Sequence, residues 1–194
     1  MALDVAALLR ETGALLTGHF RLSSGLHSPN YVQCALLLEH PGNAKAFGEA
    51  LAEKVRGFEA QSVIAPALGG VIIGYTVAEA LDLESRFTER REGQMVLRRG
   101  FHLAPGERVL IVEDVVTTGK STRETADVVQ KLGGTVAGFA SILNRSGKGN
   151  PFAPALYASL LTLGLDTYDQ ASCRLCKGGV PIDAPGSRFG GEKG

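Results

Sequence analysis

The chain has 194 residues and carries 20 Lys and Arg against 20 Asp and Glu, so its formal net charge is zero. This balance argues against a protein dedicated to nucleic acid, and 6% aromatic residues without Trp leave few platforms for stacking bases. Hydrophobic residues make up 44%, typical of a globular protein with its own core, and the length suits a single domain over residues 1–194.

The N-terminal part of the chain predicts two helices separated by an irregular segment. Asp4 and the apolar residues after it indicate a short helix over residues 3–10, without the basic start of a signal peptide. Residues 18–34 are rich in Gly, Ser and Pro, which is typical of turns and short strands. Over residues 43–58, apolar side chains recur at steps of three and four, which predicts an amphipathic helix that ends near Gly57.

The rest of the chain contains short apolar runs without alternation, as expected for strands buried on both faces of a sheet. These runs span residues 62–67, 83–88, 108–113, 135–143 and 157–161. Helical periodicity predicts helices over 71–83 and 121–132, the second capped by Ser121. We expect a loop or flexible hairpin at 90–100 and a turn at 114–119. The alternation of strands and helices predicts an α/β fold, with a central, mostly parallel sheet flanked by helices.

Ligands of such sheets bind beyond the carboxyl ends of the strands. This rule selects the loops after Ala65, Glu113 and Leu143. The most informative segment is 109–122, VLIVEDVVTTGKST, in which an apolar strand ends in two acids, Glu113 and Asp114. Two valines, two threonines, a glycine, a lysine and a serine then lead directly into the predicted helix.

The two halves of this segment suit two different groups of one ligand. The hydroxyls and the unpaired amides at the helix start favour an anion such as phosphate. Carboxylates repel phosphate, so Glu113 and Asp114 suit hydroxyl groups or a cation, and together the halves indicate a sugar phosphate. The plainer alternative is a pair of solvated acids beside an ordinary helix cap. A P-loop is rejected, because Asp114 stands where that motif needs its first glycine.

The run EDVVTTGKS resembles the phosphoribosyl diphosphate (PRPP) signature of type I phosphoribosyltransferases. The resemblance implies that Glu113 and Asp114 hold the 2- and 3-hydroxyls of the ribose. It also implies that the residues after them cradle the 5-phosphate, namely Val115, Val116, Thr117, Thr118, Gly119, Lys120 and Ser121.

Further segments resemble the orotate phosphoribosyltransferases of this family, from about residue 12 to 188. They are RLSSGLHSPNYVQC in an N-terminal hood, APALGGVIIG in a pyrophosphate loop, FTERREGQMVLRRGF in a mobile loop, SILNRSG, and the tail CRLCKGGVPIDAPGSR. The resemblance implies the type I phosphoribosyltransferase fold, with hood elements at about 12–38, a core at about 42–165 and a tail at about 166–194. It also implies transfer of the phosphoribosyl group to orotate in pyrimidine (UMP) biosynthesis.

The same resemblance assigns the base and the leaving group. Thr117, Arg145 and His27 contact orotate, and a guanidinium is the apt bidentate partner for its carboxylate. Arg90 and Arg91 bind PRPP from a lid that acts on the neighbouring subunit of a homodimer. Better-known members of the family have lysines at the positions of Gly69 and His27 and in the mobile loop, and this chain has none there. The resemblance therefore implies that Arg90 supplies this charge and joins Glu113 and Asp114 as a catalytic group.

The implied cofactor is Mg²⁺, held mainly by the substrate and without a direct protein ligand. Two other functions remain open, a purine-base phosphoribosyltransferase and a PRPP-sensing regulator on the same fold. The first would not need Arg145 for a carboxylate. The second would need an added DNA-binding domain or a strongly basic face.

The three cysteines, Cys34, Cys173 and Cys176, cannot form a closed disulfide framework, so we expect a reducing, cytoplasmic setting. Residues 62–78 are the least charged stretch, but they fall short of the roughly 20 residues of a membrane span, and no membrane partner is expected.

Cys173-x-x-Cys176 could be half of a zinc site, but no second Cys or His pair is visible at zinc-site spacing. We therefore expect two reduced thiols, with a pair from each subunit of a dimer as the open alternative. His19, His40 and His102 have no visible partners and are expected to be structural. The tail after Pro181 is expected to fray.

Overall fold

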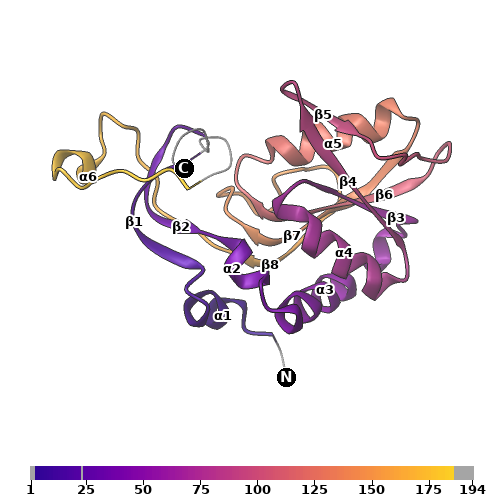
Figure 1. The fold of residues 1–194 in the computed structure, drawn as a ribbon, viewed down its shortest axis with the longest axis horizontal. Helices are drawn as coiled ribbons and strands as arrows, with labels where there is room; N and C mark the ends of the chain where they lie inside the picture. The colour runs from indigo at the N-terminus through magenta and orange to yellow at the C-terminus, as the bar shows by residue number, and fades with distance from the viewer. Residues whose placement is uncertain (1–2, 23, 186–194) are drawn as a thin grey trace.

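The computed structural model describes residues 3–22 and 24–185 and confirms the α/β architecture. Its main sheet has six strands in the order β5-β4-β3-β6-β7-β8, and only β5 runs antiparallel to its neighbour (Figure 1). The strands are β3 (Ser62–Pro66), β4 (Glu84–Arg91), β5 (Gln94–Leu97), β6 (Arg108–Val116), β7 (Thr135–Asn144) and β8 (Tyr157–Thr162). The continuous apolar runs of the sequence are therefore the strands of a parallel sheet, which is buried on both faces.

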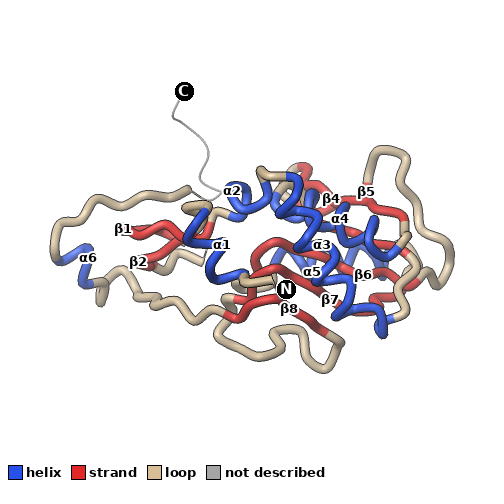
Figure 2. The backbone as a smooth tube through the Cα atoms, turned by 90° about the horizontal axis from the view of Figure 1, so that it is seen from below, coloured by secondary structure: helices blue, strands red, loops and turns tan. Residues whose placement is uncertain are grey.

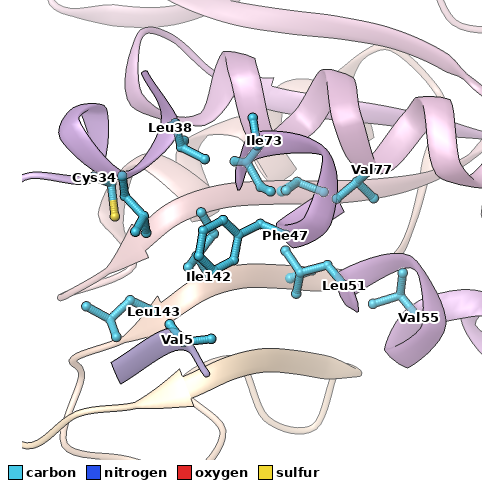
Figure 3. Packing of buried hydrophobic residues seen from close by; sticks show 14 of the residues in the cluster. Val5, Cys34, Leu38, Phe47, Leu51, Val55, Ile73, Val77, Ile142 and Leu143 are labelled. Atoms are coloured by element: carbon cyan, nitrogen blue, oxygen red, sulfur yellow. The ribbon is translucent and has the colours of Figure 1, made fainter. Parts of the chain in front are cut away.

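Helices cover both faces of this sheet and define two cores. One face packs against α1 (Val5–Glu11), α2 (Cys34–Leu38), α3 (Pro41–Val55) and α4 (Gly69–Leu81). Figure 3 shows the centre of this core, where Phe47 and Leu51 of α3 lie between Ile73 of α4 and Ile142 of β7. The opposite face packs against α5 (Lys120–Lys131) and against Phe152, which stacks on Phe139.

A separate two-stranded hairpin lies beside the main sheet. It consists of β1 (Leu15–Arg21) and β2 (His27–Val32), which pair antiparallel. The C-terminal tail runs along both sides of this hairpin and carries the short helix α6 (Arg174–Lys177) at its far end (Figure 2). Isolated bridges join His27 to Tyr168 and Phe20 to Asp183, so the tail pairs with both outer edges.

Three local predictions are wrong. β6 does not stop at Glu113 but continues through Val116, because its pairing with β7 extends to Asn144. Ser121 is not the cap of α5, since Gly119 holds that position with a φ of 71°. The segment directly after Pro181 does not fray, because the amide of Asp183 donates to the carbonyl oxygen of His19 and its carbonyl oxygen accepts from the amide of Arg21. Residues 186–194 lie outside the described part of the chain.

The expected loop or hairpin at 90–100 is a hairpin. Glu92 and Gly93 both have positive φ, which indicates the type I′ turn that joins β4 to β5. The helix expected over 43–58 begins earlier, at Pro41, and passes at Arg56 into the 3-10 turn η1 (Arg56–Phe58). Among the described residues, no helix is both long and apolar enough to cross a membrane.

Candidate functional site

The loops after β3, β6 and β7 meet at one edge of the main sheet. A Cβ atom on Gly69, the first residue of α4, would lie 2.7 Å from a carboxylate oxygen of Asp114. A Cβ on Gly70 would lie 3.3 Å from a carboxylate oxygen of Glu113. From the other side, the backbone N–H of Arg145 donates to the carbonyl oxygen of Val116 at 2.7 Å. Two glycines therefore let the start of α4 close onto the acid pair, with Arg145 on the opposite flank.

Glu113 and Asp114 lie side by side in a poorly solvated position. Glu113 is buried, and its Oε2 accepts hydrogen bonds from the hydroxyls of Ser121 at 3.0 Å and Thr122 at 3.5 Å. Burial raises the pKa of Glu113 well above its usual value, and the neighbouring charge of Asp114 raises it further. Burial also raises the pKa of Asp114, although the amide of Val115 donates to its Oδ1 at 2.7 Å and opposes the shift.

The segment after the acids forms the start of α5. Gly119 is buried and left-handed, and a Cβ there would lie 2.9 Å from both Arg123 and Phe152, so glycine is required. Arg123 donates to the carbonyl oxygen of Thr118 at 2.7 Å and fixes the turn from the far side. The amide of Lys120 donates to the hydroxyl of Thr118 at 3.3 Å. The next amides of this 12-residue helix have no acceptor within its first turn, so the helix start forms a cup suited to an anion.

Arg145 follows β7 and is partly buried. Its Nε is one of two buried side-chain nitrogen or oxygen atoms without a hydrogen-bond partner among the described residues. Burial lowers the pKa of Arg145, while the nearby Tyr31 opposes this shift. A buried N–H without an acceptor is costly unless a ligand accepts from it, so the Nε of Arg145 indicates a site for an anionic group.

Tyr31 is a site residue that the sequence reasoning missed. Burial raises the pKa of its phenol, the charge of Asp114 raises it further, and Arg145 lowers it. The phenol of this hood residue is therefore within electrostatic reach of Asp114 and Arg145. The signal was weak, because a single Tyr within a Gly- and Ser-rich segment has no spacing that marks it.

The hairpin arginines have acidic partners in this structure. Arg90 forms an ion pair with Glu124 of α5 and donates to the carbonyl oxygen of Gly93 at 2.7 Å. Arg98 and Arg99 both pair with Glu89, whereas Arg91 contacts Glu92 at 3.7 Å. Because Glu124 lies in the second turn of α5, Arg90 is held close to the anion cup.

His27 does not lie at this edge. Its imidazole is buried, 2.9 Å from the Nε2 of His19 and 3.2 Å from the Sγ of Cys176. The assignment of His27 to base binding is therefore revised, because its imidazole is held among His19 of β1 and Cys176 of the tail. His19 is likewise not partnerless, contrary to expectation.

The raised pKa of Glu113 predicts a pH-dependent stability. The folded protein holds the proton of the Glu113 carboxyl more tightly than the unfolded chain does. The resulting stabilisation is complete below the pKa of the unfolded chain, near 4.5, and is lost as the pH rises through the pKa of the folded protein. We expect Glu113→Gln to flatten the fall of unfolding free energy between pH 5 and 8, by at most about 1.4 kcal/mol per pH unit.

The measurement is urea unfolding of both proteins across this range. Glu49→Gln, at an exposed position of α3, is the matched control and should keep the wild-type slope. An unchanged slope in Glu113→Gln would show that Glu113 is already ionised in the folded protein.

Comparison with known proteins gives consistent matches. A family model described as "Phosphoribosyl transferase domain" matches residues 35–153. A protein of Carboxydothermus hydrogenoformans named orotate phosphoribosyltransferase is 50% identical over 188 residues, which are 96% of this chain and 98% of that protein. One of the same name from Thermotoga maritima is 47% identical over 184 residues, covering 95% of this chain and 98% of that protein.

Solved structures agree. An orotate phosphoribosyltransferase from Aeropyrum pernix superposes with a TM-score of 0.68 and 28% identity, covering 82% of this chain and 94% of that one. An adenine phosphoribosyltransferase from Thermoanaerobacter pseudethanolicus superposes with a TM-score of 0.60 and 18% identity, covering 69% of this chain and 88% of that one. At this identity the second likeness concerns the fold alone.

Proposed function

This chain belongs to the orotate phosphoribosyltransferase family, and we propose that it transfers the 5-phosphoribosyl group of PRPP to orotate, giving orotidine 5′-phosphate and pyrophosphate in pyrimidine biosynthesis. The observation that carries this proposal is the meeting of three unlike groups at one edge of the sheet. They are an acid pair with a buried Glu113 and a half-buried Asp114, a helix start suited to an anion, and a half-buried guanidinium whose Nε is buried and unpaired among the described residues.

These groups match the parts of the two substrates. The turn before α5 and the first residues of that helix, together residues 117–121, take the 5-phosphate through their amides and hydroxyls. Glu113 and Asp114 accept hydrogen bonds from the ribose 2- and 3-hydroxyls. Arg145 takes the orotate carboxylate through paired N–H donors, and the phenol of Tyr31 lies near the same position.

In the reaction, the bond from C1 of the ribose to the pyrophosphate oxygen breaks, and a bond from a ring nitrogen of orotate to C1 forms. Positive charge develops on the ribose as the first bond lengthens. Asp114, which is half-buried, and Glu113, which is buried, stabilise that charge where electrostatic interactions are stronger than in bulk water. No protein nucleophile is needed, and most of the rate comes from positioning and charge stabilisation.

The site fits Mg²⁺ bound mainly through the substrate. Mg²⁺ prefers oxygen ligands and is usually held by one or two carboxylates together with substrate phosphates. Asp114, whose carboxylate lies against the start of α4, and Glu113 provide such oxygens, and within residues 3–22 and 24–185 the hydrogen bonds given to them come from an amide and two hydroxyls. When bound, the ion neutralises charge on the departing pyrophosphate.

The β4–β5 hairpin supplies the remaining charge. We propose that Arg90 leaves Glu124 for the pyrophosphate, that Arg91 assists PRPP binding, and that the hairpin serves the neighbouring subunit of a homodimer. Support comes from the placement of Arg90 beside α5 and from the single turn that joins the two strands. A cytoplasmic location fits these small, charged substrates.

Arg90→Ala should lower kcat by about 10- to 100-fold, because a cation that stabilises the leaving group is lost. Arg91→Ala should mainly raise KM for PRPP. Steady-state kinetics with varied PRPP separates the two effects. Lys54→Ala, at an exposed position of α3, is the control and should match the wild type. If Arg90→Ala retained full kcat, the hairpin would have no part in the chemistry.

The function is tested by the loss of orotate absorbance when the protein is mixed with PRPP and Mg²⁺. Turnover of orotate, without turnover of adenine, hypoxanthine or guanine, is expected. Turnover of a purine alone would select the purine enzyme. PRPP binding without turnover of any base would select a regulator on the same fold.

A further inference from the structure

A second cluster of ligand atoms lies outside the site, between the hairpin and the tail. It consists of His19 of β1, His27 of β2, Cys173 just before α6, and Cys176 within α6. One atom from each residue lies within 4.8 Å of the others. His19, His27 and Cys173 are buried and Cys176 is exposed, so the cluster opens to solvent on one side.

The separations are close to those of a tetrahedral metal site. With the usual zinc–nitrogen and zinc–sulfur bond lengths, the edges of the tetrahedron are about 3.3 Å between nitrogens and about 3.6 Å between nitrogen and sulfur. The Nε2 of His19 lies 3.6 Å from Cys173 Sγ and 3.7 Å from Cys176 Sγ, and His27 Nδ1 lies 3.2 Å from Cys176 Sγ. The 2.9 Å edge between the two imidazoles needs only a small opening to admit an ion.

The hydrogen bonds around His19 prepare its nitrogen for a metal. Its Nδ1 lies 2.7 Å from the carbonyl oxygen of Val180, which can only accept, so the proton sits on Nδ1. The lone pair of Nε2 therefore points into the cluster. A backbone carbonyl that fixes the tautomer and the ring orientation is the usual second partner of a ligating histidine.

The described part of the tail, residues 166–185, contributes no side chain to the two hydrophobic cores. Among these residues, Cys173 is the only buried one. The hydrogen bonds of the tail to the hairpin include those of Tyr168 with His27, of Asp183 with β1, of Val180 with His19 and of Asp166 with Ser28. Segments with so little core are commonly stabilised by a disulfide or a metal, and both cysteines are free thiols.

We propose that His19, His27, Cys173 and Cys176 bind one structural Zn²⁺ that fastens the C-terminal tail to the hood hairpin. Two thiolates and two imidazoles form a tetrahedral set of the kind that closed zinc sites use, and all four positions are filled by protein. This proposal does not depend on the reaction proposed above. It differs from the expectation of two reduced thiols, because the structure places a pair of histidines from the same chain beside the two cysteines.

The test is metal analysis of the full-length protein purified without chelator. We expect about one zinc per chain, and loss of at least about 90% of it in Cys176→Ser, whose exposed position should spare the fold. Cys34→Ala removes the remaining cysteine, which lies in the main core, and His102→Gln removes an exposed histidine. Both control variants should keep the zinc.

Cobalt(II) provides a readout that does not depend on a variant. Protein stripped with chelator and reloaded with Co²⁺ should show the visible bands of a tetrahedral site and charge-transfer absorption from sulfur. In Cys176→Ser the charge-transfer absorption should lose intensity. Trypsin should cleave after Arg174 or Lys177 at least about tenfold faster once the metal is removed, because tail order depends on it.

Three results would overturn the proposal. The first is less than about 0.1 zinc per chain after growth with added zinc, combined with a Co²⁺ spectrum of octahedral type. The second is a zinc content that is unaffected by Cys176→Ser. The third is a disulfide between Cys173 and Cys176 in protein purified without reductant, which would assign the pair to redox chemistry.

Discussion

Asp114→Asn should lower kcat by about 100- to 1,000-fold. The amide keeps the shape of the carboxylate but cannot stabilise positive charge on the ribose. The fold should persist, because burial already raises the pKa of Asp114 and a neutral group removes that cost. The measurement is orotate turnover at saturating substrates, with thermal unfolding as the check on structure.

Asp127→Asn is the matched control for this variant. Asp127 lies on an exposed position of α5, so the same chemical change there should leave kcat unaltered. If Asp114→Asn turned over orotate at the wild-type rate, the acid pair would have no role in charge stabilisation. A low rate with an equally lowered unfolding temperature would assign the effect to folding.

Arg145→Gln should raise KM for orotate by at least about 100-fold, while KM for PRPP changes little. Each hydrogen bond to a charged group contributes roughly 1.5–3 kcal/mol, and a guanidinium supplies two in parallel to a carboxylate. Arg145→Lys should recover only part of the loss, because an ammonium group keeps the charge but not the paired donors.

Arg10→Gln, at an exposed position of α1, tests whether the loss of any positive charge has this effect. It should leave both constants unchanged. Equal increases in KM for orotate and PRPP in Arg145→Gln would place the guanidinium on the sugar phosphate instead. An unchanged KM for orotate would remove Arg145 from base recognition.

The fold was largely predictable because its signals are local. Each buried strand is a short apolar run, and Gly, Pro or charged residues separate it from the next helix. The position of the site at the carboxyl ends of the strands could be predicted because the sheet is parallel. The acid pair could be recognised because it and the following turn form one continuous segment of the sequence. The end of β6 was not predictable, since its last residues pair with β7 in the region where composition suggests a turn.

The role of Ser121 shows where a local rule failed. A serine at a helix start is normally a cap, but here its hydroxyl donates to Glu113, which is buried and needs a donor. Gly119 takes the cap position instead. The contact between Ser121 and Glu113, a residue of the preceding strand, determines that Ser121 does not cap α5. Residue preferences at helix starts do not include such a contact.

The cluster of histidines and cysteines lay beyond sequence reasoning for a different reason. His19 and Cys173 are separated by 154 positions, and neither histidine belongs to a recognisable metal motif. Only the pairing of the tail with both edges of the hairpin brings the four side chains together. Tyr31 was missed similarly, because its relation to Arg145 and Asp114 depends on how the hairpin sits over the main sheet.

The way the tail flanks the hairpin also bears on solubility. An isolated two-stranded ribbon presents unpaired N–H and C=O groups along both sides, and these can recruit strands from other molecules. Here the bridges at Tyr168 and Asp183 occupy part of each side. Residues 166–185 thus cover part of both edges of the hairpin and occupy backbone groups that could otherwise recruit a strand from another molecule.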